Sequence, residues 1–332
     1  MRAVVITRHG PPEVLEVQER PEPVSGAGEV LIDVRAAGIN FADIMARLGL
    51  YPDAPKPPCV VGYEVAGTIA QAAAGFEAGE RVLAPVRFGG YAERVGANAE
   101  AVVRLPEELS FEQGAAIPVN YSTAWQGLIR ASNLQPGERV LVHAAAGGVG
   151  IAATQIAKRH GAEVWGTASP GKHEAIRGFG VDHPVDYTRD GWERGVPKVD
   201  VVMDALGGSS FRRSYRLLRA GGRLVCFGAS GVVSGESRNL LAAARTAVRM
   251  PRFNLIRQMS DSKSVIGLNL LTLWDEAGSA ARWREPLEAM LADGTIRPVV
   301  AEAFGFERAG EAHTFITARR NVGKVVLVPE AR

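Results

Sequence analysis

The sequence has few cysteines and no long hydrophobic run. Cys59 and Cys226 are the only thiols among 332 residues, too few for a disulfide framework or a four-thiolate zinc site. No segment approaches the roughly 18 uninterrupted apolar residues of a transmembrane helix. The apolar run at residues 3–6 is too short for a signal peptide. We therefore expect a cytoplasmic protein, and these absences exclude a membrane channel and a disulfide-rich secreted domain.

The sequence also has almost no net charge, because 38 Lys and Arg residues face 36 Asp and Glu residues. This balance provides no field that would attract nucleic acid, so we expect no nucleic-acid partner. The hydrophobic fraction of 46% is ordinary for a globular protein, and the length suits two domains. Glycine is the abundant residue, with 38 copies.

The histidines show no metal-binding spacing. No two of the six lie two or four residues apart, and the cysteines fall on distant parts of the chain. Catalytic zinc usually takes three ligands from Cys, His and carboxylate side chains. We therefore expect no metal ion, and we interpret Cys226 as a buried apolar side chain in a strand.

The pattern of strands and helices predicts an α/β protein. Short β-branched or alternating runs at residues 1–7, 29–36, 64–70 and 81–84 predict an antiparallel sheet or partial barrel. From residue 137 the pattern changes to strands alternating with helices, which is typical of a doubly wound parallel sheet. The expected strands are 139–143, 162–167, 199–204 and 223–227; the expected helices are 148–160, 172–178 and 211–218, the last closed by Gly221 and Gly222.

The last part of the chain follows this parallel pattern without extending it. A strand at 265–273, helices at 276–292 and 308–318, and a strand at 323–328 are expected. We therefore predict a discontinuous first domain, residues 1–120 and 265–332, with a parallel-sheet domain of residues 121–264 between its two parts.

The sharpest motif lies between the strand at 139–143 and the helix at 148–160. Residues 145–150 (AAGGVG) read A-x-G-x-x-G, the dinucleotide fingerprint with alanine at its first glycine. Glycine permits a tight turn and close approach of the backbone to a pyrophosphate, and the helix N-terminus supplies N–H groups. The cofactor-binding candidates are Ala146, Gly147, Gly148, Val149 and Gly150.

The residues after the second parallel strand indicate which nucleotide binds. NAD enzymes usually place Asp or Glu about 20 residues beyond the fingerprint, where it accepts from the ribose hydroxyls. Residues 167–172 (TASPGK) contain no carboxylate. Ser169 and Lys172, with Tyr187 farther along, could instead hold a 2′-phosphate, so we expect NADPH. A solvent-exposed Lys172 at a helix start is the alternative.

Together these features resemble the zinc-free quinone oxidoreductase branch of the medium-chain dehydrogenase/reductase superfamily. The resemblance covers nearly the whole chain, through residues 37–43 (AGINFAD), 62–67 (GYEVAG), 120–125 (NYSTAW), 145–150, 204–208 (DALGG) and 321–326 (NVGKVV). Residues 167–169, 172–175, 183–187, 238–240 and 244–246 are similar to the vesicle amine transport protein group. Zinc-dependent relatives carry Cys near the position of Asn40 and His at that of Tyr63.

The resemblance implies a GroES-like catalytic domain and a Rossmann-type NADPH-binding domain. It also implies a homodimer, because relatives pair the edge strands of two cofactor domains. Residues implied to lie near the cofactor are Asn40, Thr123, Leu206, Phe227, Gly228 and Asn321, with Asn269 assigned to the cleft.

The function implied is transfer of hydride from NADPH to quinones or related α,β-unsaturated carbonyl compounds. Without a metal ion, charge on the substrate oxygen needs hydrogen-bond donors or solvent. The candidate donors are Asn40 and Tyr51. For Tyr51 the alternative is an aromatic side chain that packs on the substrate without donating. We interpret Asp43 as a structural carboxylate at the start of a helix. Tyr63 could fill the space that the metal ligand occupies in zinc-dependent relatives. An enoyl-thioester reductase, or a cofactor-binding protein with little turnover, remains open.

The segment at residues 231–262 contains five arginines. A helix would place Arg238, Arg245, Arg249 and Arg252 on one face, since they are 7, 4 and 3 residues apart. A membrane-surface helix has this composition, as does a flap over a hydrophobic substrate mouth, which is the interpretation we favour.

Overall fold

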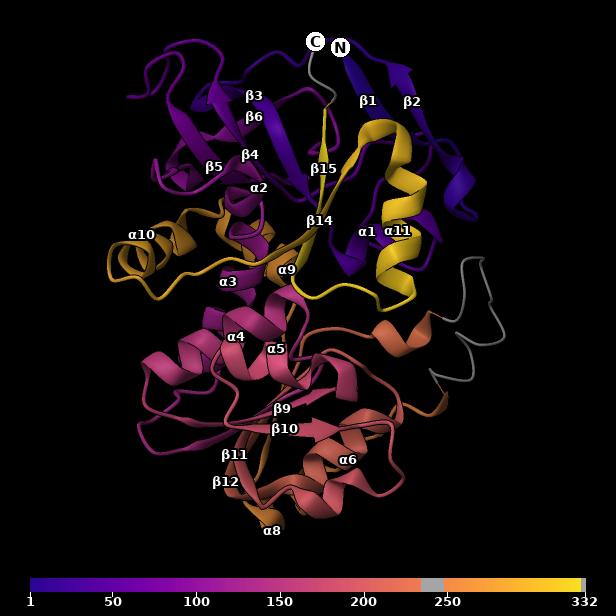
Figure 1. Cartoon of the computed structure of the whole chain (residues 1–332), viewed down its shortest axis with the longest axis vertical. Helices are drawn as coiled ribbons and strands as arrows, with labels where there is room; N and C mark the ends of the chain where they lie inside the picture. Colours follow the sequence, from indigo (N-terminus) through magenta and orange to yellow (C-terminus); the bar gives the residue numbers. More distant parts are fainter. Residues whose placement is uncertain (234–247, 330–332) are drawn as a thin grey trace.

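The computed structural model describes residues 1–233 and 248–329. These residues form two lobes stacked along the long axis of the molecule, with the first and the last described strands in the same lobe (Figure 1). The N-terminal part of the chain builds one lobe, the middle part builds the other, and the C-terminal part returns to the first.

The lobe that holds the termini is built on a seven-stranded sheet in the order β14–β15–β3–β4–β5–β7, with β6 also paired to β3. Its strands are β3 (Glu29–Gly38), β4 (Glu64–Ile69), β5 (Arg81–Pro85), β6 (Arg94–Asn98), β7 (Val103–Arg104), β14 (Val300–Gly305) and β15 (Lys324–Val328). All pairs are antiparallel except β14–β15. Strands β1 (Arg2–Ile6) and β2 (Leu15–Glu19) form a separate antiparallel pair. The sheet predicted from the N-terminal third is therefore confirmed.

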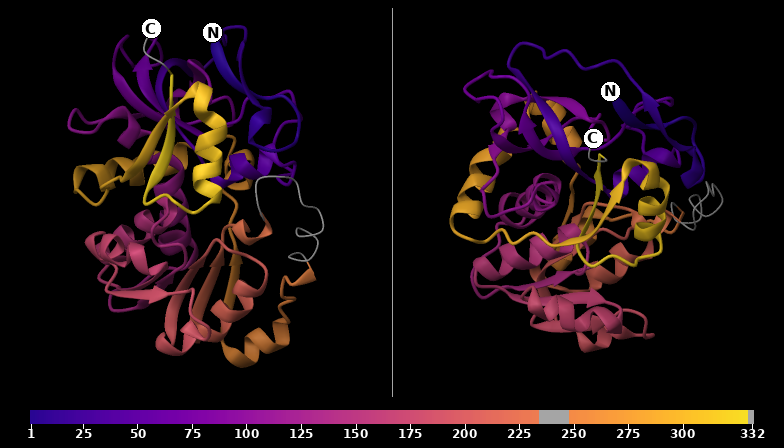
Figure 2. Two further views of the ribbon diagram at one scale, coloured as in Figure 1. Left: turned by 45° about the vertical axis from the view of Figure 1, so that its right-hand side comes forward. Right: turned by 45° about the horizontal axis from the view of Figure 1, so that its top comes forward.

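The C-terminal strands belong to this N-terminal sheet. Val326 and Leu327 of β15 pair with Gly38 and Ala37 of β3. Figure 2 shows β14, β15 and helix α11 (Ala309–Thr317), in yellow, packed beside the indigo N-terminal strands. The return of the chain places residues 321–324 at the junction between the lobes.

The second lobe is a six-stranded parallel sheet in the order β10–β9–β8–β11–β12–β13. Its strands are β8 (Arg139–Val142), β9 (Glu163–Ala168), β10 (His183–Asp186), β11 (Val199–Asp204), β12 (Leu218–Cys226) and β13 (Ser264–Gly267). All six residues of the central strand β11 are buried, as expected when helices cover both faces of a parallel sheet. The predicted α/β fold class is confirmed.

Helices cover the parallel sheet and connect the lobes. Those of the parallel-sheet lobe are α4 (Gly148–Arg159), α5 (His173–Gly178), α6 (Ser209–Leu217) and α8 (Leu255–Asp261). The others are α1 (Phe41–Arg47), α2 (Phe111–Gly114), α3 (Pro118–Trp125), α9 (Leu270–Ala277) and α10 (Arg284–Ala292). Helix α3 continues into a π-helix, Gln126–Ala131, and packs against α4, so it joins the two lobes.

Three sequence predictions about helix and strand ends were wrong. Helix α6 ends at Leu217 rather than at the Gly221–Gly222 pair, because Leu218 already has extended backbone and begins β12. The expected strand at 265–273 ends at Gly267. Asn269 then accepts a hydrogen bond from the Leu271 N–H and begins α9, and Gly278, with a φ of 69°, ends that helix. The expected helix at 276–292 is therefore two separate helices.

The edge strand β13 bears on the division into domains. It pairs in parallel with β12, from Ser264 to Gly267. The boundary expected between residues 264 and 265 thus falls inside a strand of the parallel sheet. The sequence could not show this, because the local residues do not reveal which strand β13 pairs with. We propose that the parallel-sheet domain extends to Gly267.

The arginine-containing segment is described in part. Arg238 and Arg245 lie outside the described residues, so the predicted face cannot be traced through them. Residues 251–254 are not helical, and Pro251 explains the break because it lacks a backbone donor. Arg252 therefore does not lie on a helix, and the single helical face considered for the four arginines does not extend to it.

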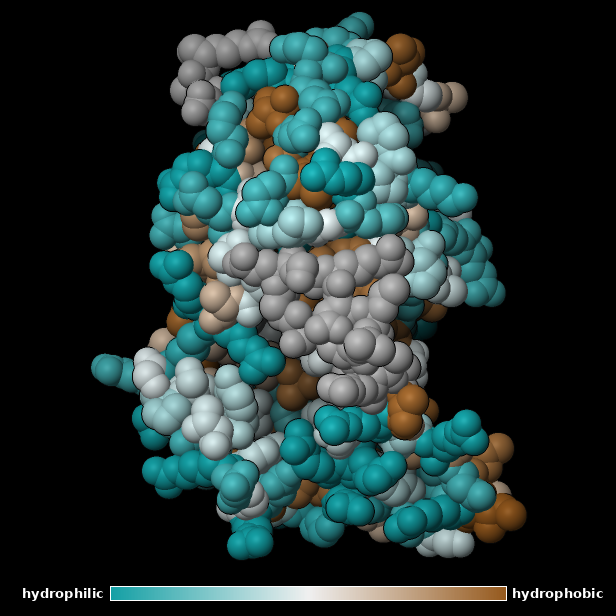
Figure 3. All heavy atoms as spheres, turned by 90° about the vertical axis from the view of Figure 1, so that its right-hand side faces the viewer, coloured by the Kyte–Doolittle hydropathy of each residue, from teal (hydrophilic) through white to brown (hydrophobic). Residues whose placement is uncertain are grey.

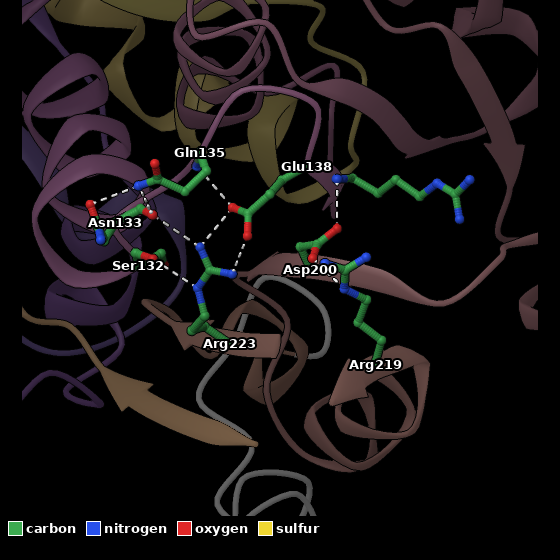
Figure 4. Close-up of polar contacts among 8 residues, drawn as sticks. Ser132, Asn133, Gln135, Glu138, Asp200, Arg219 and Arg223 are labelled. Carbon is green, nitrogen blue, oxygen red and sulfur yellow. Dashed lines mark hydrogen bonds and ion pairs between the residues drawn. The ribbon is translucent and has the colours of Figure 1, made fainter. Parts of the chain in front are cut away.

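A polar cluster holds the base of the parallel sheet together (Figure 4). The Arg223 guanidinium of β12 donates two hydrogen bonds of 2.7 Å to the Glu138 carboxylate, and its Nε donates to the Ser132 carbonyl. Beside it, Arg219 pairs with Asp200 of β11 at 2.6 Å. The cluster therefore ties β12 to the loop before β8.

Substituting Arg223→Ala should lower the free energy of unfolding by about 1–3 kcal/mol, because Glu138 loses its charged partner in a half-buried site. Both side chains are 14% exposed. Urea unfolding at pH 7 measures the change. Arg284→Ala, which breaks the more exposed pair with Glu288, is the control and should stay within about 0.5 kcal/mol of wild type. Equal losses in the two variants would contradict this account.

Candidate functional site

A cavity of about 1070 Å³ lies between the two lobes. Its walls come from α1 and the loop after it, α3, the turn before α4, the C-terminal ends of β9, β11 and β12, the start of α9, and the returning C-terminal segment. Every site residue expected from the sequence lines this one cavity: Asn40, Tyr51, Thr123, Ala146, Gly147, Gly148, Val149, Gly150, Ser169, Lys172, Tyr187, Leu206, Phe227, Gly228, Asn269 and Asn321.

The glycine turn, residues 146–150, forms one wall of the cavity and includes the first residues of α4. Gly147 is the N-cap, and no side chain caps the helix, so the N–H groups of its first turn face the cavity without a side-chain acceptor. At Gly150 a Cβ atom would lie 2.3 Å from the Ala144 carbonyl oxygen, which explains the need for glycine. The Gly323 N–H donates to the Ala146 carbonyl at 2.8 Å, so the C-terminal segment braces the turn.

A basic region adjoins this turn. The Lys172 ammonium donates to the carbonyl oxygens of Arg319 and Asn321, at 2.7 and 2.6 Å. Burial, and then the charge of Arg319, lowers the pKa of Lys172. Lys172 is therefore not simply exposed at a helix start: it ties the C-terminal segment to the cavity wall and keeps one N–H for a ligand.

Sequence reasoning did not identify Arg319, which also lines the cavity. Its φ of 56° is in the left-handed region, uncommon for a residue other than glycine. Only its place two residues before Asn321 could have indicated it. Among the described cavity-lining residues the one carboxylate is Asp53, which accepts a hydrogen bond from Asn269 on a different wall. The cavity wall at Lys172 thus carries the positive charges of Lys172 and Arg319, and the one carboxylate of the described lining lies on another wall.

A buried network fixes Asn40 at the other end of the cavity. Its Oδ1 accepts from the Lys324 ammonium at 2.7 Å, and its Nδ2 donates to Glu64 at 3.0 Å. Lysine can only donate and the carboxylate can only accept, so the orientation of the Asn40 amide is determined. One Nδ2 hydrogen has no acceptor among the described residues and is available to a ligand in the cavity.

Asp43 supports this network from behind the cavity. It accepts hydrogen bonds from the backbone N–H groups of Asn40 and Gly62 and from the Tyr91 hydroxyl. Burial raises the pKa of Asp43 to about 7, although these hydrogen bonds and the charge of Lys324 oppose the shift. The expected structural role of Asp43 at the start of α1 is confirmed by its capping box with Asn40.

Two tyrosines stand on the same side of the cavity as Asn40. The rings of Tyr51 and Tyr63 meet edge to face, with centroids 6.4 Å apart. Burial raises the pKa of Tyr51 to about 12, with a smaller contribution from the charge of Asp53. The Tyr51 hydroxyl is therefore neutral at pH 7 and can donate a hydrogen bond.

Metal-binding side chains are dispersed in the part of the chain that the structure describes. Within residues 1–233 and 248–329 no group of three or more His, Cys, Asp or Glu side chains could hold an ion. Cys226 ends strand β12, as expected for a thiol in a strand. It is partly buried against the apolar side chains of this sheet and also lines the cavity. No helix among the described residues is long and apolar enough to cross a membrane.

Family comparisons agree with the two-lobed architecture. Residues 26–107 match the alcohol dehydrogenase GroES-like domain family, and residues 179–327 match the family described as zinc-binding dehydrogenase. The human synaptic vesicle membrane protein VAT-1 homolog is 38% identical over 340 aligned positions, which cover 99% of this chain and 86% of that protein. A segment of polyketide synthase GfsB from Streptomyces halstedii is 37% identical, covering 92% of this chain and 5% of the synthase.

Solved structures show the same similarity. The quinone oxidoreductase from Thermus thermophilus, which was also solved in complex with NADPH, is 34% identical with a TM-score of 0.79. The alignment covers 99% of this chain and all of that one. The CurK enoyl reductase is 27% identical with a TM-score of 0.83, over 99% of both chains.

Two glycine substitutions should separate the binding role of the turn from its packing role. In Gly147→Ala the new Cβ meets only the Ala144 carbonyl, at 3.3 Å, and otherwise faces the cavity. This variant should melt near the wild-type temperature and bind dinucleotide at least about tenfold more weakly, a loss of about 1.4 kcal/mol. Calorimetric titration and thermal unfolding measure the two quantities.

Gly150→Ala is the matched variant and should instead lose about 1–3 kcal/mol of stability, because its Cβ would overlap backbone atoms. A Gly147→Ala variant with wild-type affinity for dinucleotide would show that no ligand phosphate approaches this turn.

Proposed function

This chain belongs to the medium-chain dehydrogenase/reductase superfamily, together with the VAT-1 homologues, and on that premise we propose that it is an NADPH-dependent reductase of quinones or related α,β-unsaturated carbonyl compounds. The observation that carries this proposal is one cavity with two different ends. An uncapped helix N-terminus and a basic region form one end, and an oriented amide beside two tyrosines forms the other.

The first end fits a dinucleotide phosphate. The first turn of α4 offers backbone N–H groups, and the glycines leave room for close approach. We propose that residues 146–150 hold the pyrophosphate and that Ser169, Lys172 and Tyr187 hold the 2′-phosphate. Thr123, Leu206, Phe227, Gly228, Asn269 and Asn321 are the proposed contacts along the rest of the cofactor.

Bound NADPH supplies a hydride. At the substrate end, the free Nδ2 hydrogen of Asn40 can donate to an oxygen on which negative charge develops. The Lys324–Glu64 pair keeps this amide from rotating, so the donor is preorganised. Reduction of a quinone needs little further stabilisation by the protein, because the hydroquinone anion is delocalised over an aromatic ring.

Reduction of an enoyl thioester is a second candidate. It is favoured by the similarity to the CurK enoyl reductase and to a segment of a polyketide synthase. The two candidate reactions would use the same cofactor-binding end. They would differ in the length of the acyl group that the cavity has to accept.

NADPH consumption with a panel of acceptors tests the proposal. We expect oxidation with 1,4-naphthoquinone and with an alkyl enone, and little oxidation without an acceptor. Faster turnover of a crotonyl thioester than of either would favour the second candidate. Tight NADPH binding without turnover of any acceptor would instead indicate a cofactor-binding protein.

Lys172→Ala tests the choice of nucleotide. Loss of a charge-assisted hydrogen bond should raise the dissociation constant for NADPH by about ten- to a hundredfold and affect NADH less. The ratio of the two constants is decisive, because loss of the ties to residues 319 and 321 alone would weaken both nucleotides equally. Arg177→Ala, on the exposed side of α5, is the charge-matched control. Equal losses for both nucleotides would refute the assignment.

We also propose that the protein is a homodimer formed at strand β13. Among the described residues this edge strand pairs only with β12, and an unpaired edge is an aggregation hazard. Helix α8, directly before it, exposes Leu255, Ile256 and Met259 by 74–78%. Figure 3 shows apolar side chains gathered at its lower right, the end of the molecule where α8 lies. A second copy of this chain would cover both features.

Light scattering should therefore give a dimer mass at micromolar concentration. The double substitution Ile256→Asp and Met259→Asp should shift the mass toward the monomer, because it places charges in the apolar contact. Wild-type protein that is monomeric at this concentration would contradict the dimer.

A further inference from the structure

The Tyr63 hydroxyl is a buried polar group without a partner. Its residue is 4% exposed, and the oxygen has no hydrogen-bond partner among the described residues. Leaving a buried hydroxyl unpaired costs about 1–3 kcal/mol. Such groups are rare in folded proteins, and a missing ligand is one of their ordinary explanations.

Other buried tyrosines show what a structural hydroxyl does in this fold. The Tyr91 hydroxyl donates to Asp43 at 3.0 Å, and the Tyr121 hydroxyl donates to Gln155 at 2.6 Å. Of the described residues that line the cavity, Tyr63 alone has a buried side-chain oxygen or nitrogen without a partner.

Tyr63 lines the same cavity as Asn40 and Tyr51. Tyr63 directly precedes Glu64, the residue that binds the Asn40 amide and the Lys324 ammonium. Its ring is held between Tyr51, edge to face, and Phe88, whose centroid is 5.2 Å away. Packing on both sides restricts the ring, so the hydroxyl position is set by the fold.

The geometry points to Tyr63 as a second hydrogen-bond donor to the substrate carbonyl oxygen, beside the free N–H of Asn40. This inference rests on the proposed function and deepens it, because it assigns substrate recognition to a residue that was expected only to fill space. Two donors from adjacent strand ends would polarise the carbonyl before reduction.

The reaction balances with Tyr63 unchanged. A hydride adds to a substrate carbon and forms a C–H bond, and the π electron pair moves to the oxygen. Tyr63 and Asn40 stabilise that oxygen anion, which then takes one proton from water. Burial raises the pKa of Tyr63, and the charge of Asp43 adds to the shift, so the hydroxyl keeps its proton and acts as a donor.

Tyr63→Phe tests the inference, with two readouts that do not depend on turnover. The affinity of nucleotide-free protein for 1,4-naphthoquinone can be followed by tryptophan fluorescence, since Trp274 and Trp283 line the cavity. We expect it to fall by about three- to tenfold, as for loss of one neutral hydrogen bond. The melting temperature without ligand should not fall, because the substitution removes an unpaired buried oxygen.

Activity gives the third readout. With NADPH, kcat/KM for an alkyl enone should fall by about a hundredfold, and by less for the quinone, whose anion is delocalised. The dissociation constant of NADP⁺ should not change. Tyr121→Phe is the matched control: it should melt at a lower temperature, because the buried Tyr121–Gln155 hydrogen bond is lost, and keep wild-type quinone affinity.

Quinone affinity within twofold of wild type would overturn the inference, as would a loss of melting temperature like that of Tyr121→Phe. If the wild-type protein oxidises no NADPH with any acceptor, the proposed function fails. The quinone affinity of Tyr63→Phe then tests the role of Tyr63 separately. Weaker binding than in wild type supports Tyr63 as a donor, and unchanged binding refutes it.

Discussion

A buried ion pair between the C-terminal strand β15 and strand β4 organises this protein. Lys324 begins β15, Glu64 begins β4, and their charged atoms lie 2.5 Å apart with 4% and 0% exposure. Separating such a pair would leave an uncompensated charge inside the protein, which costs several kcal/mol. The pair therefore holds the returning C-terminal strand in the N-terminal sheet, and the same two side chains orient Asn40 in the cavity.

The C-terminal return also completes the other end of the site. Residues just before Lys324 bind Lys172 and brace the turn before α4, through the carbonyls of Arg319 and Asn321 and the N–H of Gly323. Both ends of the cavity thus depend on one segment. A change that loosens it should disturb the phosphate end and the substrate end together.

Much of this arrangement could be predicted from the sequence where local chemistry decides. The glycines before α4, its helical periodicity and the missing carboxylate near Ser169 lie within a few residues of one another, and each has a direct physical reason. Helix ends were harder, because the turn to β12 at Leu218 and the cap at Asn269 depend on which strand pairs where. The hydrogen-bond partners of Lys172 and Asn40 could not be predicted, since they come from distant segments of the chain. Nor could the sequence show that the Tyr63 hydroxyl is buried without a partner.

We propose that one cavity binds phosphates at α4 and a substrate carbonyl beside Asn40 and Tyr63. A crystal structure of the protein with NADP⁺ and 1,4-naphthoquinone tests it most directly. We expect the pyrophosphate on the N–H groups of residues 148–150 and the 2′-phosphate beside Lys172. A quinone oxygen should lie within hydrogen-bonding distance of both Asn40 Nδ2 and the Tyr63 hydroxyl. A nucleotide bound in the reverse direction, or a quinone whose oxygens contact neither side chain, would contradict it.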